Sequence, residues 1–445
     1  MKYNDYVEFD NILPEISFNK VVDETTKEGI AEYYSLLKNE YLTAVLNPEA
    51  ADKELLECNN KPNFAECEII CKVTNFCNQR CKYCFDKNNQ AKPKIVLSKE
   101  KIMKLLKLLH KKGFHRIEWV WHGGECLSVD KKWFDETCFE MWKYSKENNF
   151  EIIFNAQTNG TLLDDEWIFI LDKYNIPVGT SYDWSGQSNR GYELSKEKLS
   201  KFYFIISVIT EENVKNLIND FKIASKNKVP FSFNFVFGNS EHQTEDFLNT
   251  TNLISEYKKY LDYFLYNNDS MITERSVVAV INKILNRPAD VCNLGNCLLS
   301  NRICINSDGK LYKCDDTNIQ EMYICDIEEI EDIDEFFYNP KIHQLLNIKK
   351  KQFKEKCLYC EFSSICCKGC INCTFRESKG EEPYSVYCHF IKEIGPYIYE
   401  KLGNLTPEEF VKLNPIVKQQ LIEKLYLPAY IKEEIQKAYD EYYNI

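Results

Sequence analysis

The sequence predicts an α/β protein in which six strand and helix units form either an incomplete β/α barrel or an open, doubly wound sheet. Between residues 67 and 266, apolar or β-branched runs alternate with amphipathic helical segments. Runs of that kind are typical of parallel strands buried on both faces. After about residue 290 the alternation stops, and spaced cysteines and short segments replace it.

The predicted strands and helices follow from composition and from end signals. The clearest helix begins after Ser98, a typical N-cap residue, carries a stripe of isoleucine and leucine side chains, and ends at Gly113. Further helices are expected over Lys131 to Asn148, Asp164 to Tyr174, Glu211 to Lys226 and Thr244 to Tyr266. The strands are expected over Cys67 to Val73, His115 to Trp121, Glu151 to Gln157, Pro177 to Tyr182, Phe202 to Ile209 and Phe231 to Phe237.

The two ends of the chain predict additional small units. A helix is expected over residues 26 to 46, and it is stopped by Pro48. The acidic run Asp326 to Glu335 is expected to be a solvated surface. The segment from Thr406 to Glu409 is typical of a capped helix start, so the tail should form two or three short amphipathic helices.

Composition excludes several classes of protein. The chain has 445 residues, enough for two or three cores, with 44% hydrophobic and 28% charged residues, as in ordinary globular proteins. A net charge of −12 disfavours a nucleic-acid partner. The first residues lack the apolar core of a signal peptide, and no run approaches the ~18 apolar residues of a membrane helix. We therefore expect a cytoplasmic protein that does not bind a membrane.

Eleven of the twenty cysteines fall into three spaced groups. The first, Cys77-x3-Cys81-x2-Cys84, suits a cubic iron-sulfur cluster in which one iron lacks a protein ligand, and an open metal position marks a reactive site. The eight others would suffice for two closed four-thiolate clusters, although Cys-x2-Cys pairs taken alone are equally typical of zinc sites. The nine remaining cysteines are interpreted as buried or idle thiols. The eight cysteines of the second and third groups are Cys292, Cys297, Cys314, Cys357, Cys360, Cys366, Cys370 and Cys388.

Four unusual loops follow the first four predicted strands. Cys77 to Cys84 follow the first strand, and Trp121 to Glu125, with sequence WHGGE, follow the second. Thr158-Asn159-Gly160 follows the third, and a loop that begins at Asp183 follows the fourth. Because reactive groups in β/α barrels gather at the C-terminal ends of the strands, the sequence predicts one site at this rim.

These residues resemble the radical S-adenosylmethionine (SAM) superfamily and, within it, the branch with a C-terminal SPASM domain. The agreement extends from Cys67 to Cys388 and rests on the first cysteine group, on Gly123-Gly124-Glu125, and on the two downstream groups with Gly309 between Cys297 and Cys314. The resemblance implies a partial (β/α)6 TIM-like barrel, then a cysteine-rich SPASM domain with two auxiliary clusters, then a helical tail. The expected domains are 1–66, 67–290, 291–395 and 396–445.

The resemblance also implies roles for individual residues. Cys77, Cys81 and Cys84 would hold a SAM-binding 4Fe-4S cluster, and Tyr83 would lie near the adenine. Asp315 would be a proton acceptor, or else a turn acid on the surface, and His122 at the rim is a candidate for substrate contact. Gly123, Gly124 and Glu125 would contact the SAM amino group. Ser181 and Asp183 would lie near the ribose and methionine, or else would only cap the end of a strand. Gln157 and Asn159 are further expected SAM contacts, or else would only form a turn.

The same resemblance divides the auxiliary ligands into two sets. Cys292, Cys297, Cys314 and Cys370 would hold the first auxiliary cluster, with Cys304 as an alternative to Cys292. Cys357, Cys360, Cys366 and Cys388 would hold the second. Two departures are notable: Cys126 replaces the usual proline after Glu125, and Asp86 stands where sulfatase-maturing relatives often carry tyrosine.

The implied activity is reductive cleavage of SAM to a 5'-deoxyadenosyl radical that abstracts hydrogen from a peptide. The leading hypothesis is a maturase that installs a thioether or carbon-carbon cross-link in a ribosomal precursor peptide, reduced by a flavodoxin or ferredoxin. The alternatives are an anaerobic sulfatase-maturing enzyme that forms formylglycine and, outside enzymes, an iron-sulfur electron carrier or metal-binding scaffold. Residues 1–66 are a candidate for leader-peptide recognition.

Overall fold

A computed structural model of the chain describes the barrel region almost completely and the remaining segments in part. The predicted helix over residues 26 to 46 and the helix start at Thr406 lie outside the described residues, as does the predicted boundary near residue 290. The described residues are 66–86, 90–185, 190–236, 250–267, 272–284, 291, 301–316, 320–342, 344, 345, 348, 360, 362, 366, 370, 386–403, 405, 409 and 412–424.

One mixed sheet of nine strands, in the order β6-β5-β4-β3-β2-β1-β7-β8-β9, forms the centre of the described structure. Strands β1 to β6 pair with one another in parallel and in chain order, without the reversal that defines a doubly wound sheet. The partial-barrel prediction is therefore confirmed. The first six strands are β1 (Glu66–Thr74), β2 (Arg116–Gly123), β3 (Glu151–Thr158), β4 (Val178–Ser181), β5 (Phe204–Ile209) and β6 (Phe231–Phe235).

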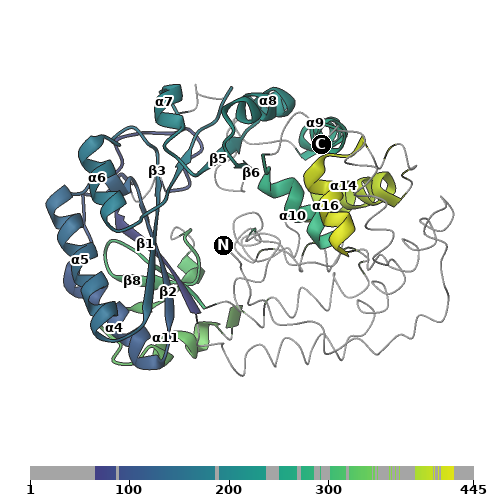
Figure 1. Cartoon of the computed structure of the whole chain (residues 1–445). Coiled ribbons are helices and arrows are strands. Elements are labelled where there is room, and N and C mark those ends of the chain that lie inside the picture. The colour runs from purple at the N-terminus through teal and green to yellow at the C-terminus, as the bar shows by residue number, and fades with distance from the viewer. Residues whose placement is uncertain are drawn as a thin grey trace.

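Helices cover the outer side of this curved sheet (Figure 1). In α4 (Lys99–Lys112) the Ser98 side chain accepts a hydrogen bond from the backbone N–H of Lys101, and Gly113 ends the helix with φ of 102°, as predicted. The region predicted as one helix from Glu211 starts instead with a 3-10 turn, η4 (Val214–Asn216). The other helices of the barrel region are α5 (Lys131–Glu147), α6 (Asp165–Lys173), α7 (Lys196–Leu199), α8 (Leu217–Asn227), α9 (Thr250–Leu265) and α10 (Arg275–Ile284), with a 3-10 turn η2 (Cys126–Ser128).

Three short strands that the sequence did not predict extend the sheet beyond β1. Strand β7 (Arg302–Ile305) pairs in parallel with β1, and β8 (Lys310–Tyr312) and β9 (Tyr323–Asp326) continue antiparallel. Strands of three or four residues are too short to show a period of two, so sequence patterning misses them. The polypeptide after residue 300 therefore completes the wall of the barrel next to the first cysteine group.

The acidic run Asp326 to Glu335, from the end of β9 to the start of α11 (Asp334–Phe337), is solvated, as expected. It also lies along α4. Lysines of α4 pair with it at 3.4 to 3.6 Å, for example Lys104 with Glu331, whose side chain is 88% exposed. Exposed pairs of this kind contribute only about 0–1 kcal/mol each. The buried Phe336 and the contact between the rings of Phe337 and Phe114, 5.8 Å apart, anchor the segment more strongly.

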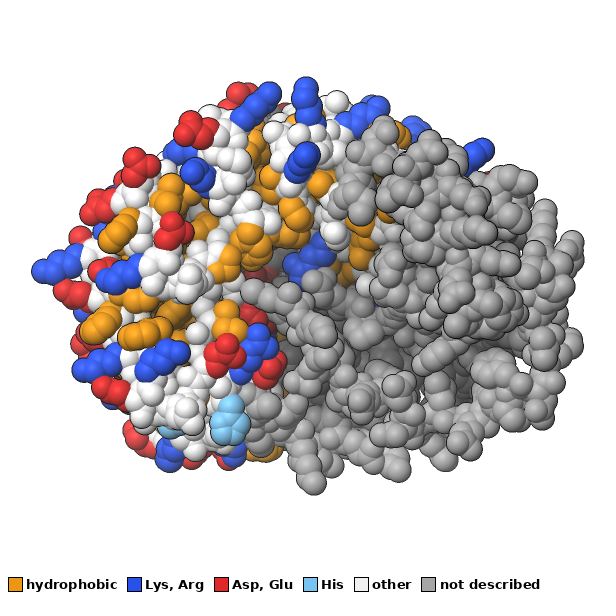
Figure 2. All heavy atoms as spheres, viewed as in Figure 1, with side chains coloured by type: hydrophobic (Ala, Val, Ile, Leu, Met, Phe, Trp, Pro, Cys, Tyr) orange, Lys and Arg blue, Asp and Glu red, His pale blue; other side chains and the backbone are white. Residues whose placement is uncertain are grey.

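The tail forms helices α14 (Val386–Gly403) and α16 (Pro415–Lys424) in its described part. The Phe390 ring lies 5.1 Å from that of Tyr257 on α9 and 5.4 Å from that of Phe235 on β6, so α14 packs at the far edge of the barrel. None of the described helices is both long and apolar enough to cross a membrane. On the visible face of the described region, cationic and anionic side chains intermingle around apolar ones (Figure 2).

Candidate active site at the barrel rim

The first cysteine group lies in the loop that leaves β1. A turn closes this loop with a 3.1 Å hydrogen bond from the Cys84 N–H to the Cys81 carbonyl. N–H donors face two of the thiols: the backbone of Gln79 lies 3.4 Å from Cys77 Sγ, and the Gln90 side chain lies 3.3 Å from Cys84 Sγ. Burial raises the pKa of Cys77 to about 11, with a contribution from the other two cysteines, so the three sulfurs share one electrostatic environment.

The donor set of this loop is of the type that a cubic iron-sulfur cluster uses. Among the described residues, no group of three His, Cys, Asp or Glu side chains is arranged to hold a metal ion. A cubic cluster instead binds each thiolate to a different iron, and hydrogen bonds to its sulfurs tune its potential. Cys77, Cys81 and Cys84, with the N–H groups that face them, meet that requirement.

Gly123 and Gly124 bring the β2 rim into contact with the cysteine loop. The Gly124 N–H donates to the Thr74 carbonyl at 2.7 Å, and the Glu125 N–H donates to the Phe76 carbonyl at 2.8 Å. A Cβ atom on Gly124 would lie 2.3 Å from the Phe76 carbonyl oxygen, and one on Gly123, where φ is 137°, would lie 2.4 Å from the Thr74 oxygen. Only glycine permits this approach.

The Glu125 carboxylate is buried and joins the β2 rim to the β3 rim. It accepts hydrogen bonds from Thr158 Oγ1 at 2.5 Å, from the Asn159 N–H at 2.7 Å and from the Leu127 N–H at 2.9 Å. Burial raises its pKa, and these hydrogen bonds oppose that shift. The predicted contact of this segment with the SAM amino group stays a prediction. Cys126, where proline is usual, is held by a 3.3 Å contact from its thiol to the Gln157 carbonyl.

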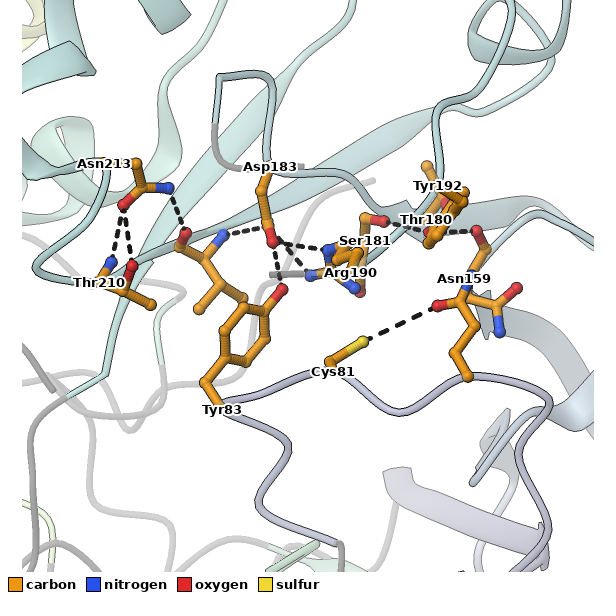
Figure 3. A network of polar contacts seen from close by, with 12 residues as sticks. Cys81, Tyr83, Asn159, Thr180, Ser181, Asp183, Arg190, Tyr192, Thr210 and Asn213 are labelled. Carbon is orange, nitrogen blue, oxygen red and sulfur yellow. Dashed lines mark hydrogen bonds and ion pairs between the residues drawn. The ribbon is translucent and has the colours of Figure 1, made fainter. Parts of the chain in front are cut away.

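A polar network at the ends of β3 and β4 contacts the cysteine loop through Asn159. The Asn159 side chain donates to Asn78 Oδ1 at 2.8 Å and lies 3.9 Å from Cys77 Sγ. The Gln157 side chain donates to Ser181 Oγ at 3.1 Å. Tyr192, which the sequence analysis missed, donates to the Asn159 carbonyl at 2.6 Å (Figure 3). Three predicted cofactor contacts, Gln157, Asn159 and Ser181, therefore lie in one network beside the predicted cluster ligands.

Asp183 forms a buried ion pair with Arg190, a second residue that sequence reasoning missed. The Arg190 guanidinium donates to the two carboxylate oxygens at 2.7 and 3.0 Å, and the Tyr83 hydroxyl also donates to Asp183 (Figure 3). The guanidinium carbon lies 5.3 Å from the centroid of the Tyr83 ring. The Val208 N–H donates to the same carboxylate at 2.8 Å. Nothing in the spacing of these residues signals the pair, because a partner seven positions away in a loop has no periodic signature.

The two predicted catalytic residues, His122 and Asp315, interact electrostatically. Burial lowers the pKa of His122, and Asp315 opposes that shift. Burial disfavours the Asp315 charge, but His122 and Lys72 outweigh it and lower the Asp315 pKa. Lys72 on β1, also missed from the sequence, is buried and pairs with the buried Asp86 at 3.2 Å. The structure therefore gathers two acids, a lysine and a histidine inside this rim.

The downstream cysteines are described only in part. Cys292, Cys297 and Cys357 lie outside the described residues, while Cys314, Cys360, Cys366, Cys370 and Cys388 lie within them. Burial, together with the charge of Cys360, raises the pKa of Cys388, which is consistent with both belonging to one set. Cys304 is buried on β7, and burial raises its pKa to about 12. The division into two auxiliary sets, and the choice between Cys292 and Cys304, stay predictions.

Comparison with known proteins identifies the barrel. Residues 71–250 match the model of the radical SAM superfamily. The barrel therefore carries a radical SAM domain. Members of this superfamily use a 4Fe-4S cluster and SAM, so the rim described above is the expected location of both in this enzyme.

The chain also resembles individual relatives and solved structures. A cysteine-type anaerobic sulfatase-maturating enzyme of Clostridium perfringens (strain 13 / Type A) is 22% identical over 368 residues, covering 76% of this chain and 97% of that protein. The structure titled native anSMEcpe with bound AdoMet superposes with a TM-score of 0.64 at 20% identity, covering 76% and 98% of the two chains. Streptococcus suis SuiB bound to the precursor peptide SuiA gives 0.50 at 17%, covering 75% and 78%.

Proposed function

We propose that this radical SAM enzyme is a peptide maturase that installs a thioether or carbon-carbon cross-link in a small ribosomal precursor peptide. When bound, the cluster and SAM supply a 5'-deoxyadenosyl radical that takes hydrogen from an unactivated carbon. The likeness to SuiB, whose structure was solved with a precursor peptide, supports a peptide substrate. The residues of this chain would supply placement, exclusion of water and proton transfer.

In this proposal the rim network positions the cofactor. Cys77, Cys81 and Cys84 would hold the cluster. Tyr83, fixed by Asp183 and Arg190, would present its ring to the adenine. The backbone of Gly123 and Gly124, held against the cysteine loop, would face the SAM amino group together with Glu125. Gln157, Asn159 and Ser181 would complete the contacts to the methionine and ribose.

The pair of Asp315 and His122 supports net oxidation of the substrate. Closing a cross-link requires the substrate to lose a proton and an electron as well as a hydrogen atom, and the proposed auxiliary clusters would accept that electron. Asp315, whose pKa is lowered by His122 and Lys72 against the effect of burial, is an available carboxylate acceptor. His122, which interacts electrostatically with Asp315, would contact the substrate beside it.

The ion pair of Lys72 and Asp86 is the observation that favours a cross-linking maturase over a sulfatase maturase. Asp86 occupies the position at which sulfatase-maturing relatives often carry tyrosine. An aspartate has no phenolic hydroxyl to offer a substrate, and here its carboxylate is buried and bound to Lys72 at 3.2 Å. At this position the chain therefore differs from the sulfatase-maturing subgroup.

Formylglycine formation is the second candidate. The cysteine-type enzyme of C. perfringens aligns over 97% of its length, and Asp315 directly follows Cys314 as the proposed proton acceptor does in that subgroup. A non-catalytic iron-sulfur carrier is disfavoured by the superfamily match and by the three-thiol set, which leaves a coordination position open.

We further propose two auxiliary 4Fe-4S clusters and two protein partners. Closed four-thiolate sets leave no iron for substrate, so their role would be electron transfer. A flavodoxin or ferredoxin would deliver the reducing electron, and residues 1–66 would contact the leader of the precursor. The ligands would be Cys292, Cys297, Cys314 and Cys370 in one set and Cys357, Cys360, Cys366 and Cys388 in the other.

Anaerobic reconstitution with SAM and dithionite tests the reaction class, because no formation of 5'-deoxyadenosine would overturn it. Mass spectrometry of a coexpressed precursor peptide tests the product. A cross-link loses two hydrogens and does not react with a hydroxylamine probe. A product that reacts with that probe as an aldehyde would favour formylglycine and overturn the cross-link.

A further inference from the structure

The exposed charged side chains that the first cysteine loop and the segment after it supply are all cationic. The region comprises the cysteine loop, residues 75–86, and the segment 90–96 that follows it. Its exposed charged side chains are Arg80, Lys82, Lys92 and Lys94. Asp86 is the single acidic residue in the sequence between positions 75 and 96, and it is buried against Lys72. A cationic surface stands out in a chain whose net charge is −12.

Hydrogen bonds fix the second segment against the first. The Asn75 side chain accepts from the Ile95 N–H at 2.7 Å and donates to the Pro93 carbonyl at 2.9 Å. Thr74 Oγ1 donates to the Ile95 carbonyl at 2.7 Å, and the Leu97 N–H donates to the Val73 carbonyl at 2.8 Å. The backbone of the segment is therefore anchored two residues from Cys77, while its side chains face solvent.

Apolar side chains accompany these cations. Phe85, Ile95 and Val96 are 40%, 40% and 38% exposed. Lys94 lies over the ring of Phe76 with its ammonium 5.0 Å from the ring centroid and also donates to the Ser128 carbonyl at 3.1 Å. Arg80 donates to the carbonyls of Cys77 and Gln79, and Lys82 pairs with Glu212 at 3.6 Å. Apolar residues within a charged rim are typical of a transient protein interface.

We infer that this surface, formed by the cysteine loop and residues 90–96, is the docking site of a small acidic one-electron donor protein of the flavodoxin or ferredoxin kind. The inference rests on the proposed reductive chemistry, in which the cluster must be reduced by one electron as the reduced flavin or ferredoxin cluster of the donor is oxidised by one. No bond is formed or broken in that step. The electron must enter near Cys77 to Cys84, and the exposed charges there complement an acidic protein.

The test compares two double charge reversals with the same net change. Lys92→Glu with Lys94→Glu alters the docking surface. Lys132→Glu with Lys143→Glu, at exposed α5 positions 85% and 58% open to solvent, is the matched control. Binding of oxidised recombinant flavodoxin to the full chain is measured by titration at low salt and again at high salt.

For the Lys92 and Lys94 variant, the affinity for flavodoxin should fall about tenfold at low salt, and this loss should be smaller at high salt. For the control, the affinity should change by no more than about twofold. Reduction of the reconstituted enzyme by flavodoxin hydroquinone should slow in parallel. With dithionite as reductant, both variants should form 5'-deoxyadenosine like the parent, which also shows that they fold.

Equal flavodoxin binding by the two variants would overturn the docking site. So would a loss confined to precursor-peptide binding, which would assign the surface to the substrate. Failure of the parent enzyme to form 5'-deoxyadenosine with dithionite would count against the proposed function instead, so the two failures are distinguishable.

Discussion

Arg190 neutralises Asp183 inside the barrel rim, and both side chains are at most 5% exposed. The same carboxylate accepts the Tyr83 hydroxyl and the Val208 N–H, so one acid connects the cysteine loop, the loop after β4 and strand β5. Burial disfavours the Arg190 charge, but Asp183 and Tyr83 outweigh this effect and raise its pKa. The Arg190 guanidinium therefore stays charged beside this carboxylate.

Arg190→Met should destabilise the enzyme and weaken SAM binding. Removing one partner of a buried ion pair leaves an uncompensated charge and typically costs about 3–5 kcal/mol. The free energy of unfolding from urea titration and the SAM dissociation constant measure the two effects. Arg116→Met is the control: Arg116 pairs with Glu66 at the N-terminal ends of β2 and β1, opposite the rim, and is 37% exposed, so stability should change by no more than about 1 kcal/mol. Equal effects of the two substitutions would contradict the role given to Arg190.

Gly124→Ala should impair cluster assembly. Its Cβ would meet the Phe76 carbonyl at 2.3 Å and push the cysteine loop away from the β2 rim. We expect the iron content after reconstitution to fall by at least half. Gly113→Ala is the control, because a Cβ there meets nothing within 4 Å, so its only cost is the strain of a positive φ of 102°. That control should lose about 1 kcal/mol of stability and retain its iron. Normal iron content in the Gly124 variant would refute the close-approach argument.

Asp315→Asn should separate SAM cleavage from product formation. The asparagine keeps the shape of the side chain but cannot accept a proton, so turnover to cross-linked peptide should fall by about 10²-fold to 10⁴-fold. Formation of 5'-deoxyadenosine should continue, because Asp315 is not among the predicted SAM contacts. Chromatography of the nucleoside and mass spectrometry of the peptide measure both. Asp308→Asn, in the β7–β8 turn, should leave both unchanged. An equal loss of nucleoside and product would place Asp315 in SAM cleavage instead.

Asp220 on α8 should make stability depend on pH. Burial raises its pKa from 3.8 to about 7, partly offset by Ser185. Because the folded-state pKa lies above the unfolded value, its favourable contribution is fully present below pH 3.8 and is lost as pH rises through about 7. The free energy of unfolding of the parent should therefore fall between pH 5 and pH 8 relative to Asp220→Asn, by up to about 1.4 kcal/mol per pH unit. Parallel curves for the two proteins would show that Asp220 is not the titrating group.

The cysteine spacing and the apolar runs predicted most of the barrel and its rim. Six strands and the α4 helix lie where composition and capping placed them, because buried parallel strands and capped helices have local signatures. The end of each strand then located Cys77, Gly124 and Asn159 on one edge. Strands β7 to β9 were missed because each is only three or four residues long.

The sequence by itself predicted the reaction class. Three thiols within eight residues and a Gly-Gly-Glu segment are local motifs, so their resemblance to those of the radical SAM superfamily can be recognised without the fold. Only the tertiary structure decided what the buried charges do. It paired Lys72 with Asp86 and Asp183 with Arg190, and it brought Asp315 within electrostatic range of His122. Such pairs have no periodic signature, since their partners are selected by the three-dimensional packing of the rim and by the cost of burying a charge without a counter-ion.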